Sequence, residues 1–157
     1  MKLSGRTDVQ APVEFVFDAI SDFDFWERAA LRRGAEVTRT DKLRQAAPGM
    51  SWMIRFGWRG RERQLHLVLK QLDRPQVLAI DGDSPSVEGG AVIEVMPLSA
   101  TRVRILVQTT IKPRTLAARL FVQSMRLGRG KVTARYEKQL RQLAAIIEQR
   151  YEDSRRG

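Results

Sequence analysis

The chain has 157 residues, enough for one domain that buries a core without disulfides or metals. It contains no cysteine and a single histidine, which excludes disulfides, thiolate metal sites and Cys/His catalytic pairs. The net charge of +10 is uneven: residues 101–157 carry 14 Lys/Arg against 4 Asp/Glu, whereas residues 1–100 carry 14 of each. Such a basic region attracts nucleic acid, anionic lipid or acidic ligands, or simply forms a solvated helix face.

The N-terminus, MKLSGRTDV, lacks the apolar run of a signal peptide. No segment approaches the roughly 18 consecutive apolar residues that span a bilayer. We therefore expect a cytoplasmic protein with a single domain over residues 1–157.

The first part of the chain predicts a strand followed by two short helices. Leu3–Val9 fits a strand, and a helix begins at Ala11-Pro12 because proline is tolerated at the first helical position. Ser21-Asp22 ends this helix and can cap the next. Apolar residues at helical spacing give each helix a buried face: Val13, Val16, Phe17 and Ile20 in the first, and Phe23, Phe25, Trp26, Ala29 and Ala30 in the second.

From Glu36 onward the apolar residues alternate, which predicts strands. The strand Met50–Trp58 carries a strongly aromatic face, and Trp58-Arg59-Gly60-Arg61 is typical of a hairpin turn. Seven short strands joined mostly by tight turns predict an antiparallel sheet. After the turn, strands are expected at Gln64–Leu72, Val77–Ile80, Val87–Met96 and Arg102–Ile111.

After Pro113 the pattern is helical to the end of the chain. Leu116, Leu120 and Leu127 fall on one side of this helical stretch, roughly opposite to the apolar side that follows. The change of side coincides with Gly128-Arg129-Gly130, so a kink or break is expected there. Beyond it, a long amphipathic helix is predicted to lie on the sheet through Val132, Tyr136, Leu140, Leu143, Ile147 and Tyr151.

This order of elements, with the motif VQAPVEFVFDAISDFDFWE, resembles the SRPBCC superfamily, which includes the START, birch-pollen-allergen-like and polyketide cyclase families. The resemblance implies an α+β helix-grip fold: a curved, seven-stranded antiparallel sheet wraps around the long C-terminal helix and leaves a cavity. Members bind lipids, sterols, polyketides, hormones or quinones, and a minority catalyse cyclisation or dehydration, so the fold does not choose among them. The matching residues are Val9, Ala11-Pro12, Val16-Phe17, Ile20, Asp22 and Trp26.

In this fold, the alternation along the strands predicts which side chains line the cavity. Their apolar and aromatic character suits a large hydrophobic ligand with few polar anchors. The competing interpretation is that they simply fill the core. The expected ligand-binding residues are Trp52, Ile54, Phe56, Trp58, Leu65, Leu67, Ile105, Val107 and Tyr136.

Polar groups for the cavity are few. Glu94 is a candidate anchor or acid if the strand face that it shares with Val92 and Met96 turns inward. Arg55, like Arg63, Arg102 and Arg104, is expected at the convex side or the rim, with Arg55 the candidate anchor for an acidic ligand group. His66 alternates with leucines and is expected to point away from the cavity. No catalytic residue is assigned, and neither a metal nor a cofactor is expected.

The segment Lys112–Lys131 is the strongest functional feature outside the predicted cavity. It is both basic and apolar, and in this fold it would lie near the cavity mouth. Basic helices with exposed apolar residues bind anionic membrane surfaces; alternatively, the apolar residues pack on the sheet or on a partner subunit. The expected lid or membrane contact comprises Arg114, Leu116, Arg119, Leu120, Phe121 and Arg126.

Together these features favour a binding protein that carries or senses a hydrophobic small molecule, such as a lipid, a polyketide or a quinone-like compound. The alternative is a polyketide cyclase/dehydratase-type enzyme that uses the same pocket, for which converging acid and base groups are needed. Nucleic-acid binding is not expected, because the basic third lacks interleaved aromatic residues and any reading motif. Monomer and homodimer both stay open.

Overall fold

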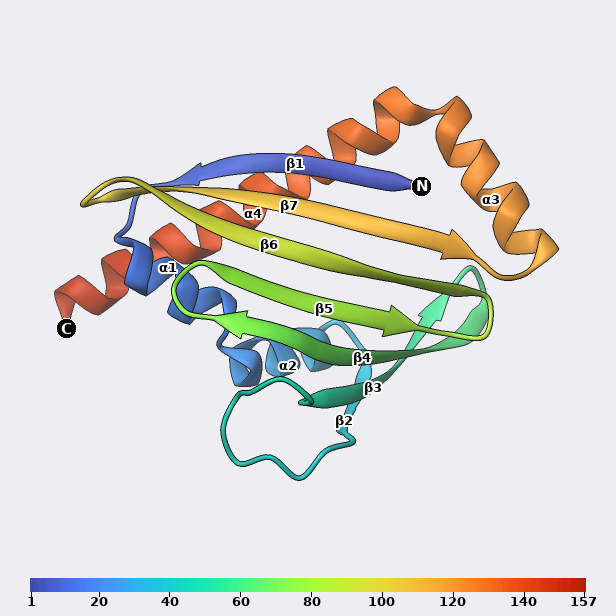
Figure 1. Cartoon of the computed structure of the whole chain (residues 1–157), viewed down its shortest axis with the longest axis horizontal. Coiled ribbons are helices and arrows are strands. Elements are labelled where there is room, and N and C mark those ends of the chain that lie inside the picture. The colour runs from blue at the N-terminus through green and yellow to red at the C-terminus, as the bar shows by residue number, and fades with distance from the viewer.

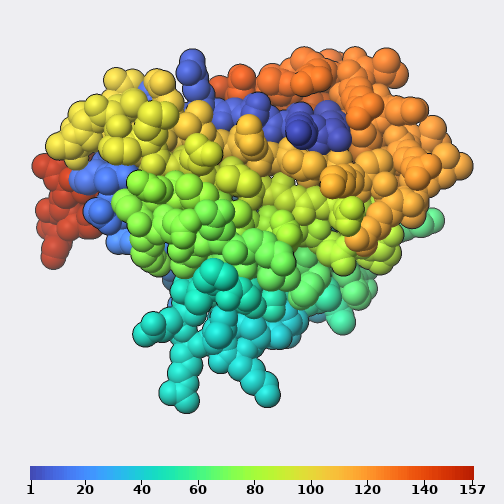
Figure 2. Space-filling view, in the orientation of Figure 1, coloured from blue at the N-terminus to red at the C-terminus, as the bar shows by residue number.

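The computed structural model describes all 157 residues. Seven strands form one antiparallel sheet in the order β1-β7-β6-β5-β4-β3-β2. Figure 1 shows α1, α2 and α4 on one face of this sheet and α3 at one end. We call the helix-covered face the inner face and the opposite one the outer face; Figure 2 shows the outer face, with the loop between β2 and β3 projecting from one edge. The elements are β1 (Lys2–Val9), α1 (Val13–Ile20), α2 (Phe23–Arg32), β2 (Glu36–Arg39), β3 (Ser51–Trp58), β4 (Arg61–Asp73), β5 (Val77–Asp83), β6 (Val87–Ser99), β7 (Arg102–Pro113), α3 (Leu116–Leu127) and α4 (Arg129–Arg156).

This arrangement confirms the predicted helix-grip fold: one strand, two short helices, six strands and a long C-terminal helix. The predicted hairpin turn between β3 and β4 is also confirmed. Arg59 and Gly60 have φ angles of 51° and 74°, and two successive positive φ angles form the type of tight turn that matches the twist of paired strands.

Asp22 ties α2 to the C-terminal helix. Its side chain accepts a hydrogen bond from the Phe25 amide (3.3 Å), which caps α2, and another from Arg150 Nη2 of α4 (2.8 Å). Burial acts to raise the pKa of Asp22, but these two hydrogen bonds and the Arg150 charge outweigh it, so the pKa lies below its ordinary value. The sequence motif that indicates the fold therefore also joins the N-terminal part of the chain to the C-terminal helix.

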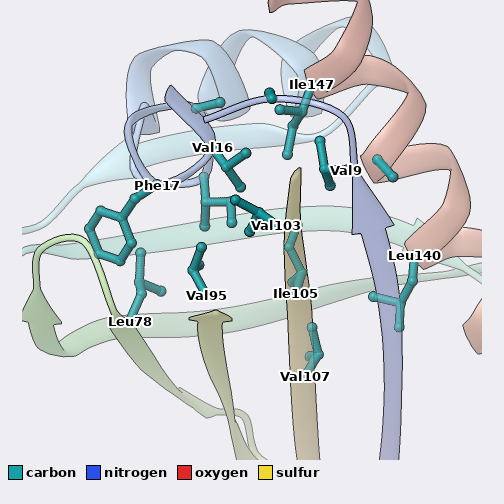
Figure 3. Close-up of a cluster of buried hydrophobic side chains, with 14 of the residues drawn as sticks. Val9, Val16, Phe17, Leu78, Val95, Val103, Ile105, Val107, Leu140 and Ile147 are labelled. Carbon is teal, nitrogen blue, oxygen red and sulfur yellow. The ribbon is translucent and has the colours of Figure 1, made fainter. Parts of the chain in front are cut away.

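The core lies between the inner face of the sheet and the helices α1 and α4 (Figure 3). Its strand residues share one phase of the pleat, so alternate side chains along β7 all point toward the helices. The fully or almost fully buried members that Figure 3 labels are Val9, Val16, Phe17, Leu78, Val95, Val103, Ile105, Val107, Leu140 and Ile147.

Gly5 of β1 lets α4 lie directly on the sheet. A Cβ atom at this position would lie 2.7 Å from Cδ1 of Leu140 and 3.1 Å from Cε1 of Tyr136. Tyr136 instead crosses β1 and brings its hydroxyl to 3.0 Å from Thr109 Oγ1 on β7. The absence of a side chain thus sets how closely the helix approaches the strand.

The predicted break in the C-terminal helical stretch is confirmed, because α3 ends at Leu127 and α4 begins at Arg129. The apolar faces of the two helices differ in burial. Leu140, Ala144 and Ile147 of α4 are buried, whereas Leu116, Leu120 and Leu127 of α3 are exposed.

Asp8 forms an ion-pair cluster on the outer face. It accepts hydrogen bonds from Arg104 Nε (2.8 Å) and Arg102 Nη2 (2.6 Å), and the hydrogen bond from Arg104 is the main reason that its pKa falls to about 2. Because the unfolded pKa is about 3.9, this cluster stabilises the fold above about pH 4, and the stabilisation disappears as the pH falls toward 2.

We therefore expect Asp8→Asn to lower the free energy of unfolding at neutral pH and to lower it much less at about pH 2, where Asp8 has lost much of its charge in the parent protein as well. Urea unfolding of both proteins at the two pH values measures the difference. A destabilisation of equal size at both values would mean that charge is not its source.

Candidate functional site

A cavity of about 300 Å³ lies between the inner face of the sheet and the helices α1, α2 and α4. This volume is at the lower end of the range for small-molecule sites, about 300–1,000 Å³. Twelve of its thirteen lining residues are hydrophobic, so it offers a ligand apolar contact from nearly every side. The lining comprises Ile20, Phe23, Trp26, Glu27, Ala30, Val37, Trp52, Ile54, Leu67, Leu78, Ile80, Ile93 and Leu143.

Glu27 is the single charged residue of the lining. One of its carboxylate oxygens, Oε1, accepts a hydrogen bond from the Trp52 indole at 2.5 Å. Trp52 is in turn held by the Phe23 ring, whose centroid lies 5.1 Å away at 54°. The carboxylate is therefore fixed at the wall by a buried indole, and the cavity presents one acidic group in an otherwise apolar surface.

The indole of Trp26 fixes α2 against α1. Its Nε1 donates to the carbonyl oxygens of Ala19 (3.0 Å) and Ile20 (3.1 Å) at the end of α1, where backbone acceptors lack helical partners. The apolar ring faces the cavity while its polar edge is satisfied. Trp26 is one of the motif residues, so the motif contributes directly to the cavity wall.

The structure places the predicted lining residues in four different surroundings. Trp52, Ile54 and Leu67 line the cavity. Ile105 and Val107 belong to the core, and Tyr136 is hydrogen-bonded to Thr109 outside the cavity. A second depression, of about 580 Å³, is lined in part by Phe56, Trp58 and Leu65.

Sequence reasoning missed the contribution of α2 to the cavity. Phe23, Trp26 and Ala30 are spaced three and four residues apart and so share one helix face, which the sequence analysis assigned to packing alone. Glu27 sits on that same face, next to Trp26. An acidic residue within the apolar face of an amphipathic helix was the signal available in the sequence.

Arg63 lies on the inner face, which corrects the expectation of a convex or rim position. It pairs with Phe56 in the β3–β4 register and shares the inner phase with Leu65. Its guanidinium carbon lies 5.5 Å from the Trp58 ring centroid, and its Nε is buried without a hydrogen bond. Arg63 therefore lines the second depression together with one acidic residue, Glu62.

Glu94 and Arg55 point away from the cavity, which corrects their prediction as anchors within it. Glu94 pairs with Leu106 of β7, in the phase opposite to Ile93 and Val95, and it is exposed on the outer face. Arg55 is likewise exposed, in the phase opposite to Ile54. The pleat decides both positions, because successive side chains of a strand point to opposite faces.

His66 also lies on the outer face, where its Nε2 is 3.3 Å from Thr40 Oγ1.

The helix α3 stands at one end of the inner face and contributes no residue to the cavity lining. Phe121 turns inward and meets Trp58 edge to face at 5.2 Å, while the Arg59 guanidinium lies 4.8 Å from both ring centroids. Arg114 is tied to Asp83 and, at 2.7 Å, to Glu88. Of the predicted lid residues, all but Phe121 are exposed: Arg114, Leu116, Arg119, Leu120 and Arg126.

None of the helices is both long enough and apolar enough to cross a membrane.

The comparison with known proteins agrees with the observed fold. Residues 1–148 match the family model described as polyketide cyclase / dehydrase and lipid transport. No curated protein matches the sequence.

Three solved structures illustrate the likeness in fold. The Zhui aromatase/cyclase from Streptomyces sp. R1128 has a TM-score of 0.67 at 16% identity, covering 96% of this chain and 94% of that one. A START superfamily protein from Mycobacterium smegmatis has a TM-score of 0.59 at 10% identity, covering 85% and 95%. A norcoclaurine synthase mutant from Thalictrum flavum, in complex with a transition-state analogue, has a TM-score of 0.66 at 10% identity, covering 96% and 95%.

Proposed function

The chain belongs to the polyketide cyclase / dehydrase and lipid transport family, within the SRPBCC superfamily, and from this premise we propose that it binds or transports a hydrophobic small molecule in the cavity between α2, α4 and the sheet. The observation that carries the proposal is the lining itself: twelve of thirteen residues are hydrophobic. Transferring an apolar ligand from water to such a surface is favourable in proportion to the area buried.

Two charged residues, Glu27 and Arg63, suggest how a ligand is oriented. Glu27 disfavours a carboxylate inside the cavity, because like charges repel in a poorly solvated site. Arg63 offers the opposite charge beside Phe56 and Leu65, two residues along each strand from Ile54 and Leu67. We infer an amphipathic ligand whose apolar body occupies the cavity and whose acidic or carbonyl end faces Arg63. A fatty acid, a polyketide acid or a quinone-like compound meets this description.

The alternative is a cyclase or dehydratase that acts on a polyketide-like substrate in the same cavity. The similarity in fold to the Zhui aromatase/cyclase supports this alternative. Acid–base catalysis of this kind uses positioned proton donors and acceptors in reach of the substrate. Glu27 is the single ionisable group of the lining, and its Oε1 is engaged by Trp52. Because the lining offers a single ionisable group and not a donor–acceptor pair, we favour binding over catalysis.

Ligand titration tests the proposal. We expect each chain of the delipidated protein to bind one molecule of the neutral apolar fluorophore N-phenyl-1-naphthylamine. Long-chain alcohols and fatty acids should displace the fluorophore. The Trp58→Phe variant leaves Trp26 and Trp52, both at the cavity, as the tryptophans that transfer energy to the bound probe. An absence of saturable binding would contradict the proposal.

Variants of Arg63 test the orientation separately. We expect Arg63→Gln to lower the affinity for a fatty acid by about tenfold and to leave the affinity for the matching alcohol unchanged. The reason is that a charge-assisted hydrogen bond contributes on the order of 1.5–3 kcal/mol. Arg55→Gln, on the outer face of the adjacent strand, is the matched control. An equal loss for acid and alcohol would remove Arg63 as the anchor.

A further inference from the structure

The outward side of α3 carries an unpartnered row of leucines. Leu116, Leu120 and Leu127 are 73%, 58% and 91% exposed. At about 100° per residue they lie within about 40° of one another around the helix axis. The opposite side of the helix holds the buried Val122 and the inward-facing Phe121. The leucine row therefore takes no part in fixing α3 to the rest of the chain.

The charge around this row is of one sign. Residues 112–131 contain six Lys/Arg and no Asp/Glu. Arg114 is neutralised by Asp83 and Glu88, which fixes the start of α3. The other basic residues of the helix and its end form none of the eight ion pairs of the structure; they are Arg119, Arg126, Arg129 and Lys131.

The positions of the arginines suit an interface between apolar and aqueous phases. Arg119 and Arg126 lie about 80–100° around the helix from the leucine row, on one flank. From there a long side chain can keep its guanidinium in the headgroup layer while its methylenes cover apolar surface. Figure 1 shows α3 at one end of the molecule, and the exposed fractions of the three leucines show that no neighbouring element covers their row.

We propose that α3 docks on an anionic lipid surface, with Leu116, Leu120 and Leu127 inserted at the headgroup boundary and Arg119, Arg126, Arg129 and Lys131 over the anionic headgroups. A second copy of this chain is a poorer occupant, because an isologous contact would bring the same basic flank against itself. A nucleic acid would neutralise the charge but would leave the leucine row in water. The docking does not depend on the ligand cavity, to which α3 contributes no residue.

Vesicle flotation of the full-length protein tests the proposal. We expect binding to vesicles in which phosphatidylglycerol makes up a third of the lipid, none to phosphatidylcholine alone, and release at high salt. Binding should be abolished in the triple variant Leu116→Gln/Leu120→Gln/Leu127→Gln. It should be weakened by about fivefold per arginine in the double variant Arg119→Gln/Arg126→Gln. Leu98→Gln, at an apolar residue of β6 that is 41% exposed, and Arg28→Gln/Arg32→Gln on α2 are matched controls that should bind like the parent.

A label at the leucine row gives a second readout that is independent of overall affinity. The chain has no cysteine, so Leu120→Cys creates a unique site for an environment-sensitive fluorophore. Anionic vesicles should shift its emission to the blue, and the same label at Leu98→Cys should not respond.

Three outcomes would overturn the proposal: no flotation with anionic vesicles at low salt, parent-like flotation of the triple leucine variant, or an unshifted label on floated protein. A concentration-dependent rise in mass, measured by analytical ultracentrifugation without lipid and abolished by the leucine substitutions, would assign the row to a second copy instead.

Discussion

Replacing Ala30 with tryptophan should lower the affinity for an apolar ligand by about 70-fold and leave the chain folded. Ala30 lies on α2 and lines the cavity. An indole at this position would occupy a large part of about 300 Å³ and would remove on the order of 100 Å² of contact from the ligand, worth about 2.5 kcal/mol at 25 cal/mol per Å². Filling an existing cavity commonly leaves stability unchanged or raises it. Titration with N-phenyl-1-naphthylamine, alongside thermal unfolding, measures both quantities.

The matched control is Leu31→Trp on the next residue of the same helix. Leu31 is 52% exposed and does not line the cavity, so the same indole there points to solvent. Parent-like affinity is expected for this variant. If Ala30→Trp also kept parent-like affinity with an unchanged unfolding temperature, the ligand would have to occupy another part of the molecule.

Replacing Ile147 with alanine should destabilise the fold by about 2–5 kcal/mol, the usual cost of removing a fully buried aliphatic side chain and leaving a cavity. Ile147 of α4 is 0% exposed and lies near Val9 and Val16, so it holds the C-terminal helix against β1 and α1 (Figure 3). Urea unfolding followed by circular dichroism gives the free energy of unfolding and its dependence on urea.

Ile146→Ala supplies the control for this second prediction. Ile146 is the preceding residue of α4, about 100° around the helix, and is 38% exposed, so its substitution removes a side chain of the same size from a partly solvated position. A loss below about 1 kcal/mol is expected there. Similar losses for the two variants would indicate that α4 contributes through helix propensity and not through packing on the sheet.

Much of the architecture follows from local rules. Pro12 before α1, Asp22 before α2 and Arg59-Gly60 between β3 and β4 act within a few residues. The boundaries at Asp22 and at Arg59-Gly60 agree with the structure, whereas Pro12 is the extended residue before α1 and not its first helical residue, so that helix begins at Val13. The reversal of apolar phase at Gly128 predicted the break between α3 and α4 for the same reason, because a helix repeats at fixed spacing.

The composition of the cavity followed local rules less closely. Trp52, Ile54 and Leu67 line it as the alternation predicts, whereas Ile105 and Val107 share the same face of the sheet and are covered by α1 and α4. A strand pattern identifies the face of a side chain but not the element packed above it. That depends on where the helices cross the sheet, which here involves the glycine at position 5.

The sequence by itself determined the helix-grip fold, the break in the C-terminal helical stretch and the basic, leucine-bearing character of α3. These properties arise from periodicity, turn chemistry and charge, all of which act along the chain. Only the tertiary structure placed Glu27 in the cavity wall, turned Arg63 inward and Glu94 outward, and left Leu116, Leu120 and Leu127 uncovered. The physical reason is that these positions depend on strand register and helix packing, which join residues far apart in the chain.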